Sequence, residues 1–309
     1  MNNFKKVGLS ALAGSLAAFS ANAVEYSVAG DAQAVYSSAQ GNENATEASN
    51  GKGIGVDTDL AFSASGELDN GWTVSISHVL DTNDNVTNSS TQMAIGMGSL
   101  GTLQFNQSGG ASTNAIDDVL PFAYEEPWDG TTGTSEFNIF GSQLNAGSVS
   151  YKTPTFELPF GVTASGAVDY DPNASLAGAA AGGVVADAPS AEGAVVKLTH
   201  ESGLTLGGGF TKVGNTDAIK GESGGTGYAK FSNGGLTIGY QEFYHNAAIT
   251  EKGTTTRGID SDGSGYALAY TAGDVSLSYS VQNEQTNAIG ATAALEEEEV
   301  SAFQAAYTM

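Results

Sequence analysis

Short segments in which apolar and polar residues alternate recur along most of this chain. From Val275 to Gln282, for example, apolar Val, Leu, Tyr and Val alternate with polar Ser, Ser, Ser and Gln. A period of two predicts a β-strand with one apolar face and one polar face. Segments of this kind run from about Glu25 to Tyr307, and we count about fourteen of them, which predicts an all-β chain.

The connections between these segments alternate between short and long. Asn70-Gly71 marks one short turn, because this pair supplies the positive φ angles that a tight hairpin needs. Further short turns are expected near residues 100, 157, 202, 234 and 273. A barrel that crosses a bacterial outer membrane has short turns at one end and long loops at the other, so this order predicts a transmembrane antiparallel β-barrel. A large soluble β-sandwich would show the same alternation of residues, but no sorting of its connections by length.

The first 23 residues have the composition of a cleaved signal peptide. Two lysines give a positive start, Val7–Ser20 is an apolar stretch of small residues, and residues 21–23 (Ala-Asn-Ala) match the A-x-A cleavage pattern. A buried N-terminal helix is the alternative interpretation. We therefore expect a signal peptide at 1–23 and an outer-membrane barrel at 24–309, with the mature chain outside the cytoplasm.

The chain is strongly acidic. Its 34 Asp and Glu residues outnumber its 10 Lys and Arg residues, and the formal net charge is −24. Nucleic acid is therefore an unfavourable partner. The acidity either keeps exposed loops soluble or attracts cations to the protein, and both effects can operate together. Cysteine is absent, so a disulfide framework and thiolate metal sites are excluded.

The longest connection without a strand pattern lies at about 107–146. If the N-terminus is periplasmic, this connection is the third loop on the outer side. It combines carboxylates with apolar and aromatic residues, which a freely solvated loop would not need. We therefore expect it to pack on the inner wall with its carboxylates facing water. The carboxylates are Asp117, Asp118, Glu125, Glu126 and Asp129, and the apolar group is Val119, Leu120, Phe122, Tyr124 and Trp128.

The sequence combines four features. They are the signal peptide, the alternation of strands and loops, the loop stretch Ile116–Trp128, and the strand stretch Ser148–Pro154 that follows it. With these features the whole mature chain resembles the general porins of Gram-negative bacteria, especially those of the alphaproteobacterial type. The resemblance implies a barrel of about sixteen strands, a homotrimer, and an inward-folded third loop that narrows a water-filled pore. It also implies that the five carboxylates form a constriction that filters solutes by size and charge, with Phe122, Tyr124 and Trp128 packing the loop in place.

The sequence departs from that family in its basic residues. Family members oppose the acidic loop with several arginines on the wall, whereas Arg257 is the only arginine here and falls in a loop. By strand parity, Lys152 and Lys197 point into the lumen. Parity also places carboxylates on the lumen wall, and these are Asp57, Asp59 and Asp169. The imbalance predicts a cation-selective channel for the passive diffusion of ions and small hydrophilic solutes.

Two other functions share the barrel architecture: an adhesin or ligand receptor whose acidic loops bind outside, and a substrate-specific channel. An inward third loop would favour a diffusion channel over an adhesin or receptor, and a substrate-specific channel lies between the two. An enzyme is not expected, because His78, His200 and His245 are well separated and the pattern groups none of them with a nucleophile and an acid. We expect no cofactor and no specific metal site, and at most a loose bridging of the acidic loops by divalent cations. The expected partners are outer-membrane lipid, small solutes and ions.

The strand pattern and the family resemblance predict different numbers of strands at the end of the chain. Val300–Tyr307 would be about the fourteenth strand, whereas the resemblance implies one more hairpin and a terminal aromatic residue. We therefore expect that the sequence lacks about two strands. The alternative is a barrel of about fourteen strands, since barrels with even strand numbers in this range occur.

Overall fold

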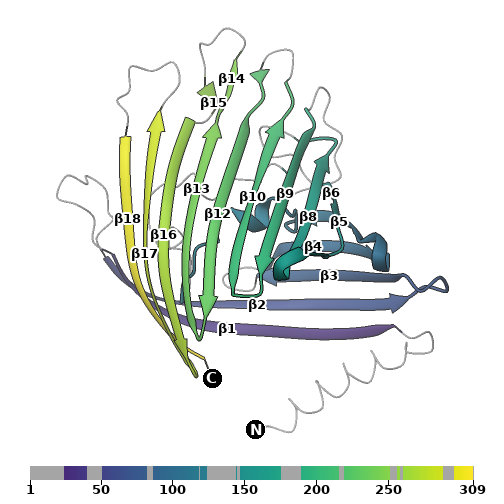
Figure 1. The fold of residues 1–309 in the computed structure, drawn as a ribbon, viewed down its shortest axis with the longest axis horizontal. Coiled ribbons are helices and arrows are strands. Elements are labelled where there is room, and N and C mark those ends of the chain that lie inside the picture. The colour runs from purple at the N-terminus through teal and green to yellow at the C-terminus, as the bar shows by residue number, and fades with distance from the viewer. Residues whose placement is uncertain are drawn as a thin grey trace.

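The protein is built mainly from one long antiparallel sheet (Figure 1). The computed structural model describes residues 24–39, 51–81, 86–117, 119–123, 144, 147–174, 189–215, 219–250, 256–257, 260–287 and 296–308. The expected signal peptide at 1–23 lies outside these residues.

The main sheet contains 15 strands, and all of them except β7 follow one another in a single path of neighbours. In order of pairing, the path consists of β1 (Glu25–Ala39), β2 (Gly51–Glu67), β3 (Thr73–Asp81), β4 (Thr87–Gly96), β5 (Thr102–Ser108), β6 (Ser148–Lys152), β8 (Val162–Asp171), β9 (Ala191–His200), β10 (Leu204–Val213), β12 (Ser223–Asn233), β13 (Leu236–Asn246), β16 (Asp260–Ala272), β17 (Val275–Asn287) and β18 (Glu296–Tyr307). β7 (Phe156–Leu158) pairs with β8. A second, small sheet is formed by β11 (Ile219–Lys220), β14 (Ala248–Thr250) and β15 (Thr256–Arg257).

The predicted all-β antiparallel architecture is confirmed. The sheet curls strongly, so that β1–β3 run across the direction of β12–β18 (Figure 1). Among the described residues, no pairing joins β1 to β18, the two ends of the path. The helical elements of the described residues are short 3₁₀ turns: η2 (Gly98–Leu100), η3 (Asn114–Ile116) and η6 (Pro159–Gly161). No helix there is long and apolar enough to cross a membrane.

The alternating pattern misses parts of several strands. Residues 223–227 and 260–263 show no alternation, but they belong to β12 and β16. The stretch Pro154–Pro159 was expected to be a turn, but it contains the short strand β7. The first two segments are made of Gly, Ser, Thr and Asp, which show no apolar alternation even where the backbone is paired. Pairing with β13 and β17, which the local sequence does not reveal, holds these segments in the sheet.

The two faces of the sheet differ in character, as β13 shows. Ile238, Tyr240 and Tyr244 are exposed on one face, while Gln241 and Phe243 are buried on the other. The exposed face continues across the sheet with large apolar side chains, among them Val168, Leu206, Leu268 and Tyr279. We call this the outer face, and we call the opposite face, on which residues 113–117 and 119–123 lie, the inner face. An apolar outer face of this extent requires an apolar environment.

Candidate functional site

The first described part of the connection after β5, residues 113–117 and 119–123, is bound to the inner face of the sheet by buried side chains. Asp169 of β8 holds its first part, because one carboxylate oxygen, Oδ2, accepts hydrogen bonds from the backbone N–H and the hydroxyl of Thr113 at 2.7 and 2.8 Å. Thr113 precedes the turn η3, and both Thr113 and Asp169 are buried. The carboxylate therefore fixes the point at which the connection begins to cross the wall.

Gln241 of β13 makes the most extensive contact with this segment. Its side-chain oxygen accepts the backbone N–H of Val119 at 2.9 Å. Its amide nitrogen donates to the carbonyl oxygens of Ile116 at 3.1 Å and Asp117 at 2.8 Å, and to the hydroxyl of Thr226 in β12 at 2.9 Å. Gln241 is 0% exposed, so these bonds form away from solvent. One side chain thus satisfies three backbone groups of a segment that has no strand partner of its own.

Ser278 of β17 provides a third anchor. Its hydroxyl oxygen accepts the backbone N–H of Ala123 at 2.8 Å. The residues from Thr113 to Ala123 are therefore attached in turn to β8, β13 and β17, which are separated along the path of the sheet. The segment extends across the inner face, and its course is fixed mainly by wall side chains.

Polar side chains also cross-link β5 and β6 at the start of the connection. The amide nitrogen of Asn106 donates to the hydroxyls of Ser148 and Ser150 at 3.0 and 2.9 Å. Gln104 donates to Asn106 at 2.6 Å and to the carbonyl oxygen of Gly110 at 2.8 Å. The ammonium group of Lys152 donates to Gln104 at 2.8 Å. This network fixes the two strands from which the connection leaves and to which it returns.

The acidic residues expected at a constriction are only partly within the described chain. Asp117 is half-buried, and its carbonyl oxygen is one of the acceptors of Gln241. Phe122 is half-buried beside the Ala123 anchor. The remaining members of the expected loop set lie outside the described residues, and these are Asp118, Tyr124, Glu125, Glu126, Trp128 and Asp129.

The register of the first strands brings together carboxylates that are distant in sequence. Asp59 of β2 lies directly opposite Asp31 of β1 and Asp81 of β3. Asp57 lies opposite Gln33 of β1 on the same face. These positions alternate with outer-face residues such as Phe62, so they belong to the inner face. Three aspartate positions therefore form a row across β1–β3, although directly opposed like charges destabilise a sheet.

The two expected lumen lysines occupy inner-face positions of other strands. Lys152 of β6 is half-buried and bonded to Gln104. Lys197 of β9 is exposed and lies opposite Ser165 of β8 and Gly207 of β10. These two lysines therefore lie on strands in the middle of the sheet, whereas the aspartate row lies on its first three strands.

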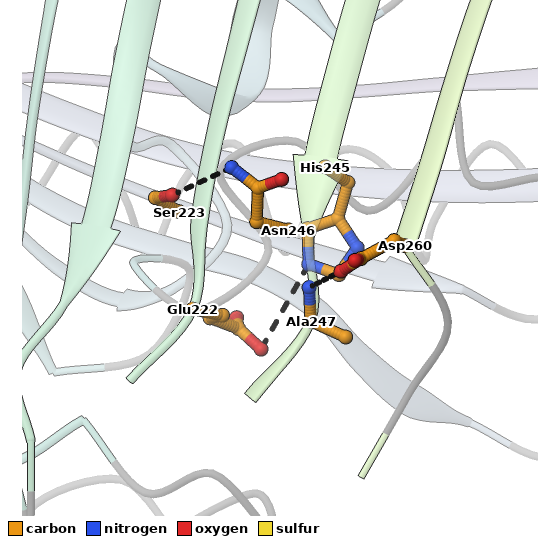
Figure 2. Close-up of polar contacts among 6 residues, drawn as sticks. All are labelled: Glu222, Ser223, His245, Asn246, Ala247 and Asp260. Atoms are coloured by element: carbon orange, nitrogen blue, oxygen red, sulfur yellow. Dashed lines mark hydrogen bonds and ion pairs between the residues drawn. The ribbon is translucent and has the colours of Figure 1, made fainter. Parts of the chain in front are cut away.

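A second polar cluster lies at the ends of β12, β13 and β16 (Figure 2). The Nε2 atom of His245 is 3.9 Å from a carboxylate oxygen of Glu222. Asp260 accepts the backbone N–H of Ala247 at 2.7 Å, and Asn246 donates to Ser223 at 3.3 Å. These contacts tie β12, β13 and β16 together where the small sheet begins, so the cluster has a structural role. No group of three or more His, Cys, Asp or Glu side chains suited to a metal ion occurs within the described ranges.

The comparisons with known proteins agree with this architecture. A family model described as Gram-negative porin matches residues 8–309. The chain belongs to the Gram-negative porin family. Among curated proteins, none matches this porin. As a member of the family it is an outer-membrane channel for small solutes, and the family is not a class of enzymes.

Solved porin structures share the fold of this porin at low sequence identity. OmpF of Salmonella typhi in complex with daunomycin has a TM-score of 0.63 at 10% identity, over 93% of this chain and 86% of that chain. A porin refined at 1.8 Å has a TM-score of 0.57 at 13% identity, over 92% and 89%. The anion-selective porin from Comamonas acidovorans has a TM-score of 0.53 at 15% identity, over 85% and 82%.

Several site residues of this porin were missed by sequence reasoning. Asp31 and Asp81 follow the same parity as Asp59, so strand parity could have identified them. Gln241 and Ser278 carry no such signal, because their partners lie 122 and 155 residues away in the chain. A glutamine or serine on the polar side of a strand is ordinary, and only the fold reveals what it binds.

Proposed function

We propose that this porin forms a water-filled, cation-selective channel through which ions and small hydrophilic solutes diffuse passively. The observation that carries the proposal is the hydrogen-bonded attachment of residues 113–123 to the inner sides of β8, β13 and β17. A segment held across the lumen narrows it, and side chains at the narrowest point act most strongly on passing ions. In this proposal the loop carboxylates form the constriction, and these are Asp117, Asp118, Glu125, Glu126 and Asp129.

The charges on the wall support cation selectivity. The positions of Asp59 and Asp81 lie in a row with Asp31, and the expected lumen lysines are Lys152 and Lys197. A lumen with more carboxylates than cationic groups raises the local concentration of cations. The chain as a whole carries a net charge of −24, so its loops add to the same field.

The test is the reversal potential of the purified protein in planar bilayers across a potassium chloride gradient. We expect the sign that corresponds to cation preference, and a clear anion preference would overturn the proposal. Replacing Asp59 and Asp81 together by Asn should shift the reversal potential towards zero. Asp262→Asn is the matched control, because Asp262 is exposed on the outer face opposite Tyr244 and should leave selectivity unchanged.

We extend the proposal to assembly and processing. The resemblance to general porins of the alphaproteobacterial type supports a homotrimer, and the pattern at 1–23 supports cleavage before Val24. Native mass in a mild detergent tests the first point, and a monomer would contradict it. Sequencing the N-terminus of protein extracted from outer membranes tests the second, with Val24 as the expected first residue.

A further inference from the structure

Four glycines of the inner face lie directly under the segment that crosses it. A methyl group at Gly239 of β13 would lie 2.6 Å from Cδ of Pro121, and one at Gly265 of β16 would lie 2.6 Å from Cδ1 of Leu120. The other two glycines, which belong to β9 and β10, are Gly193, at 2.6 Å from Cγ2 of Thr113, and Gly209, at 2.9 Å from Cδ1 of Ile116. Carbon atoms in contact prefer about 3.5–4.0 Å, so a methyl group at any of these positions would force a neighbouring atom to move.

The backbone does not require glycine at these four positions. None of them is among the glycines with positive φ, and all four are paired within strands. Glycine in a strand interior weakens the strand, because it loses more conformational entropy on folding and packs no side chain. Its presence marks a site where another group approaches the backbone closely. At all four sites the crossing segment, from Thr113 to Pro121, supplies one of the atoms that approach, and at Gly239 it supplies all three of the nearest.

We propose that Gly239 and Gly265 are positioning residues that set how far residues 113–123 project from the wall, and thereby the width of the channel. This inference rests on the proposed function, since it assumes that the segment narrows a conducting pore. At Gly239 the three nearest atoms all belong to Pro121 and Leu120 of the crossing segment. At Gly265 the nearest atom is Cδ1 of Leu120, and Cγ of Gln282 in the wall follows at 2.9 Å. At Gly209, by contrast, the nearest atom is the carbonyl oxygen of Ala194 in the wall at 2.6 Å, so a substitution there would also disturb the sheet.

The direction of the effect follows from the geometry. The segment cannot move through the wall, so a methyl group at Gly239 displaces Pro121 by about 1 Å towards the lumen. The hydrogen bonds of Gln241 on one side and Ser278 on the other hold the rest of the segment in place. A small displacement therefore narrows the channel without releasing the loop.

Single-channel conductance of Gly239→Ala in planar bilayers tests this inference. We expect a fall in conductance on the order of 1.5-fold, with a smaller size limit for uncharged solutes. Gly227→Ala is the matched control, because Gly227 is an exposed strand glycine of β12 whose added methyl would meet no atom within 4 Å. Its conductance should equal that of the unmodified protein.

A second substitution that restores the conductance distinguishes a displaced segment from a general loss of structure. Pro121→Ala removes the Cδ atom that the new methyl group would meet, so Gly239→Ala combined with Pro121→Ala should regain the original conductance. If Gly239→Ala does not fold, Gly265→Ala with Leu120→Ala provides a second pair of measurements at the next strand, where the methyl group also meets Cγ of Gln282 at 2.9 Å in both variants. Unchanged conductance in the glycine variants, or double variants no better than the single ones, would overturn the inference and leave the channel function standing. An unmodified protein that does not conduct would overturn both.

Discussion

Removing the side chain of Gln241 should loosen the segment that crosses the inner face while leaving the sheet intact. Gln241→Ala deletes three hydrogen bonds to the backbone of the segment, at Ile116, Asp117 and Val119. Each such bond contributes about 0.5–1.5 kcal/mol net, so together they hold the segment with about 2–4 kcal/mol. Since 1.4 kcal/mol corresponds to a tenfold change, the released state should become about 30- to 700-fold more populated.

Single-channel recording provides the assay, because a loosened segment makes the open-state current fluctuate and the closures more frequent. Gln285→Ala is the matched control, since Gln285 is exposed in β17 and bonds only to the side chain of Glu297 at 2.9 Å among the contacts described for it. We expect quiet currents from the control and added noise from Gln241→Ala. Current traces of Gln241→Ala that match both the control and the unmodified protein, with the barrel folded, would refute this reasoning.

Three further predictions concern stability and the other anchors. Asp169→Ala removes two hydrogen bonds from Thr113 to a buried carboxylate, so the free energy of unfolding in denaturant should fall by about 2–4 kcal/mol. Ser278→Ala removes the acceptor of the Ala123 N–H, so current noise should rise less than for Gln241→Ala, in line with a loss of about 1 kcal/mol. Phe160→Gly should raise the melting temperature, because Phe160 has φ of 66° and is 92% exposed, and glycine relieves about 1–2 kcal/mol of left-handed strain.

Each of these predictions has a result that contradicts it. Asp69→Ala, in an exposed turn, is the control for Asp169→Ala, and equal stabilities of the two variants would argue against the anchor. If the current noise of Ser278→Ala were as large as that of Gln241→Ala, the noise would not depend on the number of hydrogen bonds that each substitution removes. A lower melting temperature for Phe160→Gly would show that the exposed aromatic ring contributes more than its backbone strain costs.

The sequence predicts the strands well where apolar side chains mark the outer face. Val275, Leu277 and Tyr279 alternate with serines, and they lie on β17 with 41–48% exposure, as a strand with one apolar outer face requires. The row of Asp31, Asp59 and Asp81 follows from parity only after register is known, because register depends on how the strands pair. The local pattern therefore predicts on which face of its own strand a residue lies. Which residues lie next to each other on neighbouring strands is known only from the structure.

The crossing segment shows why the rest of the site is hidden from sequence. Its anchors are Asp169, Gln241 and Ser278, which belong to strands far from it in the chain and are chemically ordinary. Parity placed Asp169 on the expected wall, but it could not assign Thr113 as its partner. Hydrogen bonds between a loop and a sheet leave no periodic trace, because the loop itself has no period.

The glycines under the crossing segment also weaken the alternation of apolar and polar residues in their strands. The glycine run in β10 includes Gly209, and the Gly- and Ser-rich start of β16 includes Gly265, and both glycines lie under the crossing segment. Where a loop packs closely on a strand, the strand has glycine instead of residues with larger side chains. The alternation of apolar and polar residues that identifies a strand is then lost at these positions. The missing side chains at Gly209 and Gly265 are therefore explained by the segment that packs on them, and the local sequence alone does not reveal that contact.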